Sequence, residues 1–233
     1  MISDPAGIHL LDWALIDEQL DTEGYALLPG LLQPQETDDL LALIPEMTAT
    51  PLAASNLGHG ELFYFDAVFP AALKAARAAL YCHLVSAANR WNTALGTGCR
   101  YPEDLDSFVA RCHQAGQTQT VSHLSRLRRA GHVVLHQRAD GEQIFPFQLV
   151  ALLAEPGKDF TGGEFVMTEQ RPRMQSRPIV VPLRRGDAAI ISTAQRPVKG
   201  AKAWYRVNLK HAIGTVRGGE RIGLTLSFHD APV

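Results

Sequence analysis

The spacing of apolar residues gives the first half of the chain a helical character. Residues 24–30 have the pattern of a short strand ending in a turn, and residues 35–44 then show helical apolar spacing. In residues 71–95 the large apolar side chains follow one another at steps of seven and four: Leu73, Leu80, Leu84, Trp91 and Leu95. That spacing puts them on one face of a long helix, ready to pack against a sheet. Residues 102–114 predict another helix, with Pro102 and two acids in its first turn.

The second half changes to short apolar or β-branched runs separated by Gly and Pro, which is the pattern of successive strands. The runs cover residues 133–135, 144–154, 163–168, 179–183, 188–192, 204–213 and 222–228. We therefore predict a mainly β fold with a helical layer and a double-stranded β-helix (jelly-roll, cupin-like) core, whose mouth can hold a metal and a small ligand. We expect one domain over residues 1–233, with 1–118 as a mainly helical buttress and 119–233 as the barrel.

Composition agrees with a globular chain. The 233 residues are 46% hydrophobic, which is enough to bury a core. The sequence contains no apolar run of about 18 residues and no secretion signal at its start, so we expect a cytoplasmic protein with no membrane partner. Cys82, Cys99 and Cys112 lack metal or disulfide spacing, and we expect them to be buried small residues. The oligomeric state is left open.

Charge is divided unequally between the halves, although the net charge is only −2. Residues 1–117 hold 15 acidic against 5 basic side chains, whereas residues 118–233 hold 9 against 17. A basic half attracts an anionic small molecule or a phosphate backbone, although solvated surface arginines give the same count.

Several sequence blocks of the second half resemble a known family. They are Gly162-Gly163-Glu164-Phe165, residues 168–177, Arg185-Gly186-Asp187-Ala188, Tyr205-Arg206-Val207-Asn208 and Phe228-His229-Asp230. With them come His136, His211 75 residues later, and Arg221 ten residues after His211. The chain resembles a prokaryotic group of Fe(II)/2-oxoglutarate dioxygenases, described as oxidative demethylases of damaged nucleic acid and related to AlkB-like and prolyl-hydroxylase-like enzymes.

The resemblance implies a cofactor, a co-substrate and three residue roles. It makes His136 and His211 ligands of Fe(II), and Arg221 the two-pronged clamp for the far carboxylate of 2-oxoglutarate. Two imidazoles and one carboxylate on one face of iron leave three positions open, two for the 2-oxoglutarate chelate and one for dioxygen.

The third ligand departs from the family pattern, which is His-x-Asp. This chain has Arg138 at that position, and a guanidinium has no lone pair to donate. We predict Asp140 as the replacement, because side chains at 136, 138 and 140 share a face if the strand continues and Gly141 allows a sharp turn. Two alternatives are a two-histidine site with water or an anion in third place, and His132, four residues before His136 on the same strand face.

Residues for substrate binding are less sharply indicated. Arg138, Arg171 and Arg173 suit contacts to phosphates beside the mouth, and Tyr205 or Arg206 faces the pocket, although alternation alone does not say which. A loop over 171–177 that is pinned by internal hydrogen bonds fits the sequence equally well.

Three functions follow from these patterns. The first is a dioxygenase that hydroxylates or oxidatively demethylates a nitrogenous substrate, either a small molecule or a modified base in nucleic acid. The second is a catalytically degenerate relative that serves as a ligand-binding or nucleic-acid-binding module, for which Arg138 is the argument. The third, a cupin-like metal enzyme without a keto acid, is disfavoured by Arg221 and the family blocks.

Overall fold

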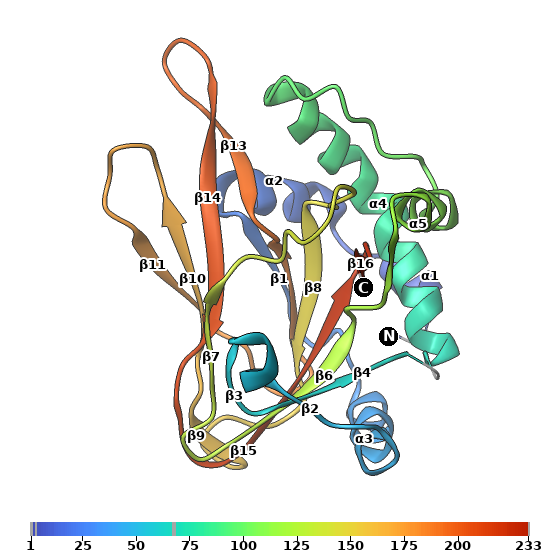
Figure 1. Ribbon diagram of the computed structural model, residues 1–233, viewed down its shortest axis with the longest axis vertical. Helices are drawn as coiled ribbons and strands as arrows, with labels where there is room; N and C mark the ends of the chain where they lie inside the picture. The colour runs from blue at the N-terminus through green and yellow to red at the C-terminus, as the bar shows by residue number, and fades with distance from the viewer. Residues whose placement is uncertain (1, 3, 67–68, 233) are drawn as a thin grey trace.

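Two antiparallel sheets pack face to face, and helices cover the outer face of the larger one (Figure 1). The computed structural model describes residues 2, 4–66 and 69–232. Within these residues the larger sheet has the order β1-β12-β8-β15-β6-β4-β2 with β9 paired to β15, and the smaller has the order β11-β10-β14-β7-β3 with β13 paired to β14. The sheets confirm the predicted mainly β barrel with a helical layer.

The strands have the following bounds: β1 Tyr25–Leu28, β2 Thr50–Pro51, β3 Gly58–His59, β4 Glu61–Tyr64, β5 Gln117–Gln119, β6 His123–Arg128, β7 His132–His136, β8 Phe147–Leu152, β9 Phe160–Gly162, β10 Phe165–Gln170, β11 Arg177–Val181, β12 Ala188–Ser192, β13 Gln195–Lys199, β14 Trp204–Ile213, β15 Val216–Ser227 and β16 Ala231–Pro232. The helices are α1 Pro5–His9, α2 Trp13–Glu23, α3 Pro34–Leu43, α4 Ala71–Ala94 and α5 Leu105–Gln114, with short 3-10 turns η1 Ile44–Glu46 and η2 Leu52–Ser55.

Side-chain alternation decides which residues of each strand enter the barrel. In β14 the side chains of Val207, Leu209 and His211 are buried, while their neighbours Asn208 and Lys210 are exposed. Met167 of β10 lies directly opposite His211 and is also buried. The interior between the sheets is thus a mainly apolar core into which a few polar side chains point.

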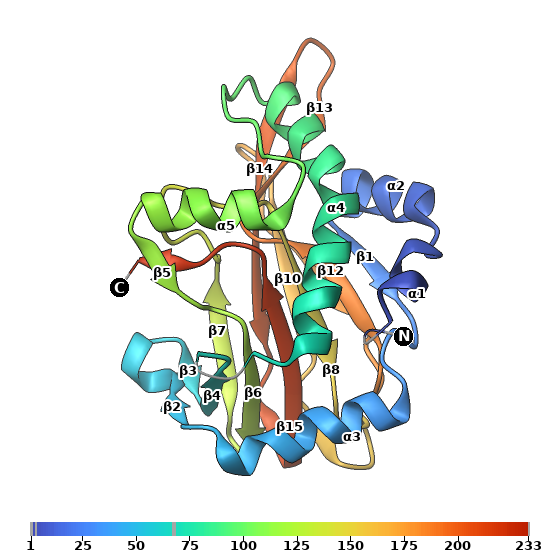
Figure 2. The same cartoon turned by 90° about the vertical axis from the view of Figure 1, so that its right-hand side faces the viewer.

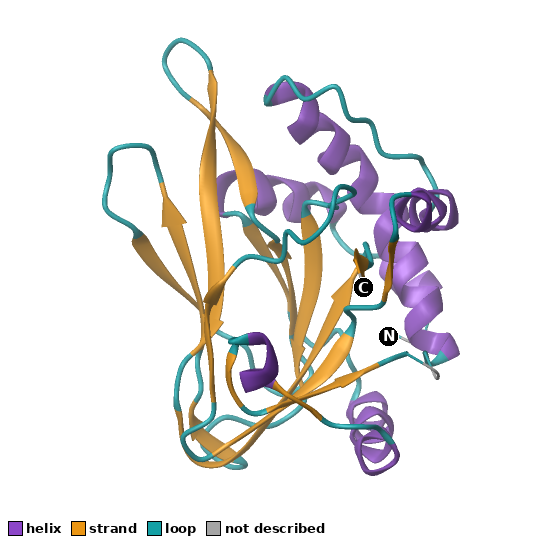
Figure 3. Cartoon of the chain, in the orientation of Figure 1, coloured by secondary structure: helices purple, strands orange, loops and turns teal. Residues whose placement is uncertain are grey.

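A second core lies between the larger sheet and the helices. Helix α4 crosses that sheet (Figures 2 and 3). Its predicted stripe of Leu73, Leu80, Leu84 and Trp91 is buried. The apolar face of α4 packs against the outer face of the larger sheet, and both faces are shielded from water. This packing stabilises the sheet that forms most of the barrel wall.

Some local expectations were wrong. Helix α5 begins at Leu105 rather than Pro102, because the Asp104 carboxylate accepts a hydrogen bond from the Ser107 N–H at 2.8 Å and caps the helix there. Of the cysteines, Cys112 is buried but Cys82 and Cys99 are exposed. The first half is mainly helical and contains the predicted strand within 24–30 as β1, but it also supplies β2 and β4 to the larger sheet and β3 to the smaller, which were not predicted.

Among the described residues, no helix combines the length and the apolar character needed to cross a membrane.

Candidate active site

The two histidines singled out in the sequence lie side by side between the sheets. His136 ends β7 and is paired in register with His211 of β14. Their ring centroids are 4.2 Å apart with 56° between the planes. Two imidazoles 75 residues apart in sequence are therefore brought to one place by strand pairing.

A β-bulge in β7 decides which side chains accompany His136. The register advances by two residues on β14, from His211 to Ile213, but by three on β7, from His136 to Val133. The extra residue reverses the alternation, so that Val133 joins His136 in lining the interior pocket. The expectation that His132 shares the face of His136 was therefore wrong, because it assumed an unbroken strand.

His211 is enclosed on all sides. Its side chain is buried, and Phe165 stacks on its ring at a centroid distance of 5.9 Å and an angle of 10°. The side-chain amide of Gln148 lies 3.2 Å from His211 Nε2, and His211 Nδ1 has no hydrogen-bond partner. Burial, followed by the nearby His136, lowers the pKa of His211 well below its usual value, so the ring is neutral at pH 7.

His123 of β6 lies near these two rings and lines the same pocket, although no sequence pattern singled it out. Nδ1 of His123 lies 2.8 Å from the Val121 carbonyl, and Nδ1 of His136 lies 2.9 Å from the Val134 carbonyl. A carbonyl only accepts, so each Nδ1 carries a proton. Burial lowers the pKa of His123 to about 3 and also lowers the pKa of His136.

The three histidines line a small pocket, here called the histidine pocket, with a volume of about 40 Å³. Its other polar walls are Ser125, Arg138, Gln148 and Thr225, and Phe165 is among its apolar walls. At His136 and Arg138 it meets a wider outer mouth of about 530 Å³, which these two residues also line. The histidine pocket thus forms the inner end of a cavity that opens at the end of β7.

Arg138 lies at the junction of the histidine pocket and the outer mouth. Its backbone N–H donates to the Thr193 carbonyl at 3.0 Å, and the neighbouring Gln137 amide donates to the carbonyls of Ala194 and Leu209 at 2.9 Å each. These bonds fix the backbone just beyond β7. No hydrogen bond or ion pair joins the Arg138 guanidinium to any described residue, although its charge contributes to the lowered pKa of all three histidines.

Asp140 is exposed and lines only the outer mouth, where His136 is also present. The turn that follows it is held by the buried Gln117 side chain, which accepts hydrogen bonds from the N–H groups of Glu142 at 2.9 Å and Gln143 at 2.6 Å. Gly141 adopts φ +109°, the turn that its position suggested. Within the described residues no three His, Cys, Asp or Glu side chains are grouped closely enough to hold a metal ion.

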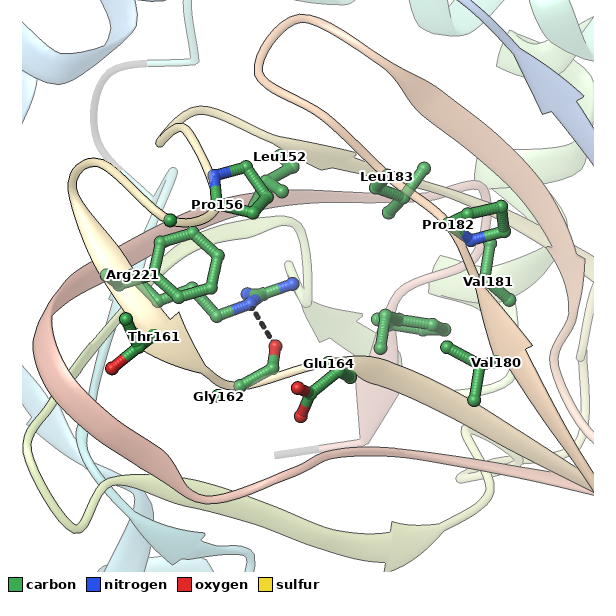
Figure 4. A pocket seen from close by; sticks show the side chains of 14 residues that line it. Leu152, Pro156, Thr161, Gly162, Glu164, Val180, Val181, Pro182, Leu183 and Arg221 are labelled. Carbon is green, nitrogen blue, oxygen red and sulfur yellow. Dashed lines mark hydrogen bonds between the residues drawn. The ribbon is translucent and has the colours of Figure 1, made fainter.

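Arg221 occupies a different cavity of about 310 Å³, shown in Figure 4. Its side chain is buried, Nε donates to the Gly163 carbonyl at 2.9 Å, and no described carboxylate forms an ion pair with it. Burial alone lowers the pKa of Arg221 to about 10, which leaves it charged at pH 7. The walls around it are mainly apolar, as in Leu152, Phe160 and Leu183. A buried, unpaired guanidinium in an apolar cavity is a strong site for a carboxylate.

Phe165 lines both the Arg221 cavity and the histidine pocket. Gly223 lies beside both sites. A Cβ at this position would be 3.1 Å from Arg221 Nη1 and 3.3 Å from Oγ of Ser125, and Ser125 lines the histidine pocket. The Arg221 cavity and the histidine pocket are therefore neighbours that share Phe165 as a wall.

The remaining predicted binding residues lie elsewhere. Arg171 donates to the Glu169 carboxylate at 2.8 Å, and the same carboxylate pairs with the buried Arg196, so Arg171 already has a protein partner. Arg173 is exposed on the β10–β11 loop with φ +63°. Tyr205 is half-buried on the inward-facing side of β14 while Arg206 is exposed, which settles their alternation, but neither lines the histidine pocket.

The fold is a double-stranded β-helix, and it brings the histidine pair and Arg221 into neighbouring cavities. The chain is similar to a 2OG-Fe(II) oxygenase-family oxidoreductase from Burkholderia pseudomallei, with a TM-score of 0.55, 18% identity and coverage of 96% of this chain and 94% of that one. It is also similar to a prolyl-4-hydroxylase from Pseudomonas putida, with a TM-score of 0.53, 13% identity and coverage of 91% and 96%. At such identities the likeness demonstrates the shared fold.

The family itself is identified from the sequence. Residues 60–231 match the family described as "Oxygenase, catalysing oxidative methylation of damaged DNA", and the chain belongs to that family. It is also 40% identical over 153 residues to the Mycobacterium tuberculosis protein Rv2227, an alignment that spans 66% of each chain.

Sequence reasoning missed His123, Gln148 and Phe165 as parts of the site. Gln148 did carry a signal, since it is a lone polar residue in a strand whose six residues are all buried. His123 stands two residues before Ser125 on a strand, so their side chains share a face, but nothing in the sequence indicated which face lines the barrel.

Proposed function

We propose that this protein is an Fe(II)- and 2-oxoglutarate-dependent dioxygenase that hydroxylates or oxidatively demethylates a nitrogenous substrate. The observation that carries the proposal is the pair of neutral imidazoles, His136 and His211, 4.2 Å apart and beside a buried arginine that no described acid neutralises. Neutral imidazole is the form that binds a metal, and an unpaired buried guanidinium is matched by a carboxylate of the co-substrate.

In this proposal His136, His211 and Arg221 each have a definite role. His136 offers Nε2, because its Nδ1 proton is held by the Val134 carbonyl. His211 binds once the Gln148 amide turns aside or through its unpartnered Nδ1. Arg221 anchors the far carboxylate of 2-oxoglutarate while the apolar walls exclude water. Bound iron, with 2-oxoglutarate and dioxygen, would supply the oxidising chemistry that attacks an inert C–H bond.

The donor set fits iron at two positions and leaves the third to be supplied. We infer that Asp140 supplies it by movement of residues 139–141, which lie between the segments fixed by Gln137 and by Gln117. Arg138 opposes this, since its positive charge at the mouth repels Fe(II). The protein should therefore bind iron more weakly than a site with a carboxylate at position 138.

For the substrate we propose a modified base in nucleic acid. The family description, the excess of basic residues after position 117 and the open outer mouth support this choice. An N-methyl carbon hydroxylated in such a mouth would be released as formaldehyde. A phosphate-tracking substrate also implies that binding weakens steeply as salt rises.

Arg138 favours a second candidate, a binding module that has the oxygenase fold but does not catalyse. In that case the guanidinium permanently takes the place of a ligand, and the cavities bind an anion or nucleic acid. The two candidates differ in iron binding, which makes them separable.

An anaerobic Fe(II) titration tests the proposal. We expect saturable binding that His136→Ala abolishes and Asp140→Ala weakens at least tenfold, while Asp106→Ala, which removes an exposed carboxylate on α5, changes nothing. Absence of binding by the parent protein would favour the binding module. Equal affinity in the Asp140→Ala variant would remove Asp140 from the site.

The substrate class needs a separate assay. We expect succinate release from 2-oxoglutarate to rise in the presence of methylated oligonucleotides relative to unmethylated ones of the same sequence. Stimulation by free amino acids instead would keep the dioxygenase and replace its substrate.

A further inference from the structure

The outer face of the smaller sheet has no helix packed on it in the described chain, because the helices lie on the side of the larger sheet (Figure 1). Along β14 every second side chain points away from the barrel into solvent. These exposed side chains are Trp204, Arg206, Asn208 and Lys210. Lys199 of β13 lies directly opposite Trp204 and shares its face. The five residues are called the β14 stripe below.

The β14 stripe has three cations that no described acid neutralises. The side chains of Lys199, Arg206 and Lys210 form no ion pair and no hydrogen bond with a described residue. The residues that lie opposite the stripe on β10 and β13 are uncharged: Thr168, Gln170, Gln195 and Pro197. Arg206 and Lys210 are four residues apart, roughly 14 Å along the strand. A row of unpaired cations with no acid beside it attracts a polyanion.

Trp204 indicates which polyanion fits. Its side chain is 48% exposed, and it is the one aromatic residue among the exposed large apolar side chains of the described chain. With Lys199 it lines a cavity of about 350 Å³ beside α4, which leaves room against the indole. Nucleic-acid bases stack on such a ring whatever their sequence, and one stacked base is worth about tenfold in affinity. The bases of a duplex are already stacked on one another, so the stripe suits a single strand.

Arg206 connects the stripe with the outer mouth. It lines a cavity of about 540 Å³ together with Gln137, and Gln137 also lines the outer mouth. Glu142 is the one acid among the described walls of this cavity, and it forms no ion pair with Arg206. Arg206 precedes His211 by five residues, roughly 17 Å along β14, which is the length of about five stacked nucleotides. A strand on the stripe can therefore continue past Gln137 into the mouth.

We infer that the β14 stripe binds a single nucleic-acid strand, with one base stacked on Trp204 and the phosphates held by its three cations. The strand then passes over Gln137, so that its target nucleotide enters the outer mouth. The inference rests on the proposed function for this last step, whereas binding to the stripe requires neither iron nor a methylated base.

The test uses the full chain freed of metal by a chelator, and an unmethylated thymidine strand of about 12 nucleotides. Binding is followed by the anisotropy of a dye on the strand and by the tryptophan fluorescence of the protein. The variants are Trp204→Ala, Trp204→Phe and Arg206→Ala. The matched control is Arg129→Ala, which removes an exposed arginine from the turn between β6 and β7, at the far end of the barrel from the β13–β14 hairpin (Figure 1). All three positions are exposed, so the variants should fold, and thermal melting verifies it.

We expect Trp204→Ala to weaken binding about tenfold. Trp204→Phe should keep most of the affinity but lose the fluorescence quenching that base stacking causes, although Trp13 and Trp91 remain. Arg206→Ala should weaken binding and lower the slope of log affinity against log salt concentration by about 0.7, the value of one phosphate contact on a single strand. Arg129→Ala should leave the affinity and the slope unchanged.

Absence of binding by the parent, indifference to Trp204→Ala, or a loss in Arg129→Ala equal to that in Arg206→Ala would overturn the inference. Tighter binding of a duplex of the same length or of poly-glutamate would do so as well, and so would a dimer of the protein that Trp204→Ala dissociates in sedimentation. Because the assay contains no iron and no methylated base, its failure is distinct from failure of the Fe(II) titration and of the succinate assay.

Discussion

Replacing Arg138 by aspartate should convert a weak iron site into a strong one. The guanidinium lies at the edge of the histidine pocket, where Fe(II) between His136 and His211 would meet it. At an effective dielectric constant of about 20, a divalent ion roughly 6 Å from a unit positive charge is destabilised by about 5.5 kcal/mol. Solvent in the outer mouth screens part of this repulsion energy. If about half of it remains, the repulsion of about 2.7 kcal/mol lowers the Fe(II) affinity about a hundredfold.

The variant also gains a donor. Arg138→Asp removes the repulsion and places a carboxylate two residues after His136, so Fe(II) affinity should rise at least 100-fold. The assay is an anaerobic equilibrium titration with a competing chelator, and Arg129→Asp is the matched control for the change in net charge. Unchanged or weaker Fe(II) binding by Arg138→Asp would refute the view that Arg138 opposes iron in this pocket.

Three further substitutions test the supports of the site. Gly223→Ala would put a Cβ 3.1 Å from Arg221 Nη1, so the guanidinium should shift and 2-oxoglutarate affinity, measured by calorimetry, should fall about tenfold. Gln117→Ala removes four hydrogen bonds from a fully buried side chain and should destabilise the fold by about 3 kcal/mol in urea unfolding. Glu169→Gln breaks the buried pair with Arg196 and should cost about 3 kcal/mol at pH 7. Burial raises the pKa of Glu169, but the hydrogen bonds from Arg171 and Arg196 outweigh it and the net pKa is lowered. The difference in unfolding free energy between the parent and Glu169→Gln should therefore be full above pH 4.5 and shrink as the pH falls further. A pH-independent difference would contradict this.

The elements that sequence periodicity predicted well are those whose burial is one-sided. The α4 stripe from Leu73 to Trp91 and the β14 alternation that buries His211 both arise because each element has one buried face and one solvent-exposed face. The 133–135 run also became a strand, but its bulge could not be foreseen, because an extra residue in one strand is set by pairing with β14. That bulge is why Val133, and not His132, accompanies His136.

The candidate site was predictable only as far as spacing constrains it. Pairing of β7 with β14 joined the two histidines, but the sequence carried no sign that Phe165 would stand between His211 and the cavity of Arg221. Asp140 was expected from its alternation with His136, and β7 ends before that alternation can continue. Contacts of this kind depend on long-range packing between the sheets, which no local pattern records.

Anaerobic mixing of the protein with Fe(II) and 2-oxoglutarate shows whether the histidine pair and Arg221 form one site, because a 2-oxo acid chelated to Fe(II) gives a visible charge-transfer absorption. We expect this absorption to appear with the parent protein, to disappear in His136→Ala and in His211→Ala, and to require higher 2-oxoglutarate concentrations in Arg221→Ala. Absence of the absorption from the parent at saturating Fe(II) and 2-oxoglutarate, or its persistence without His136, would mean that the histidine pair does not hold iron.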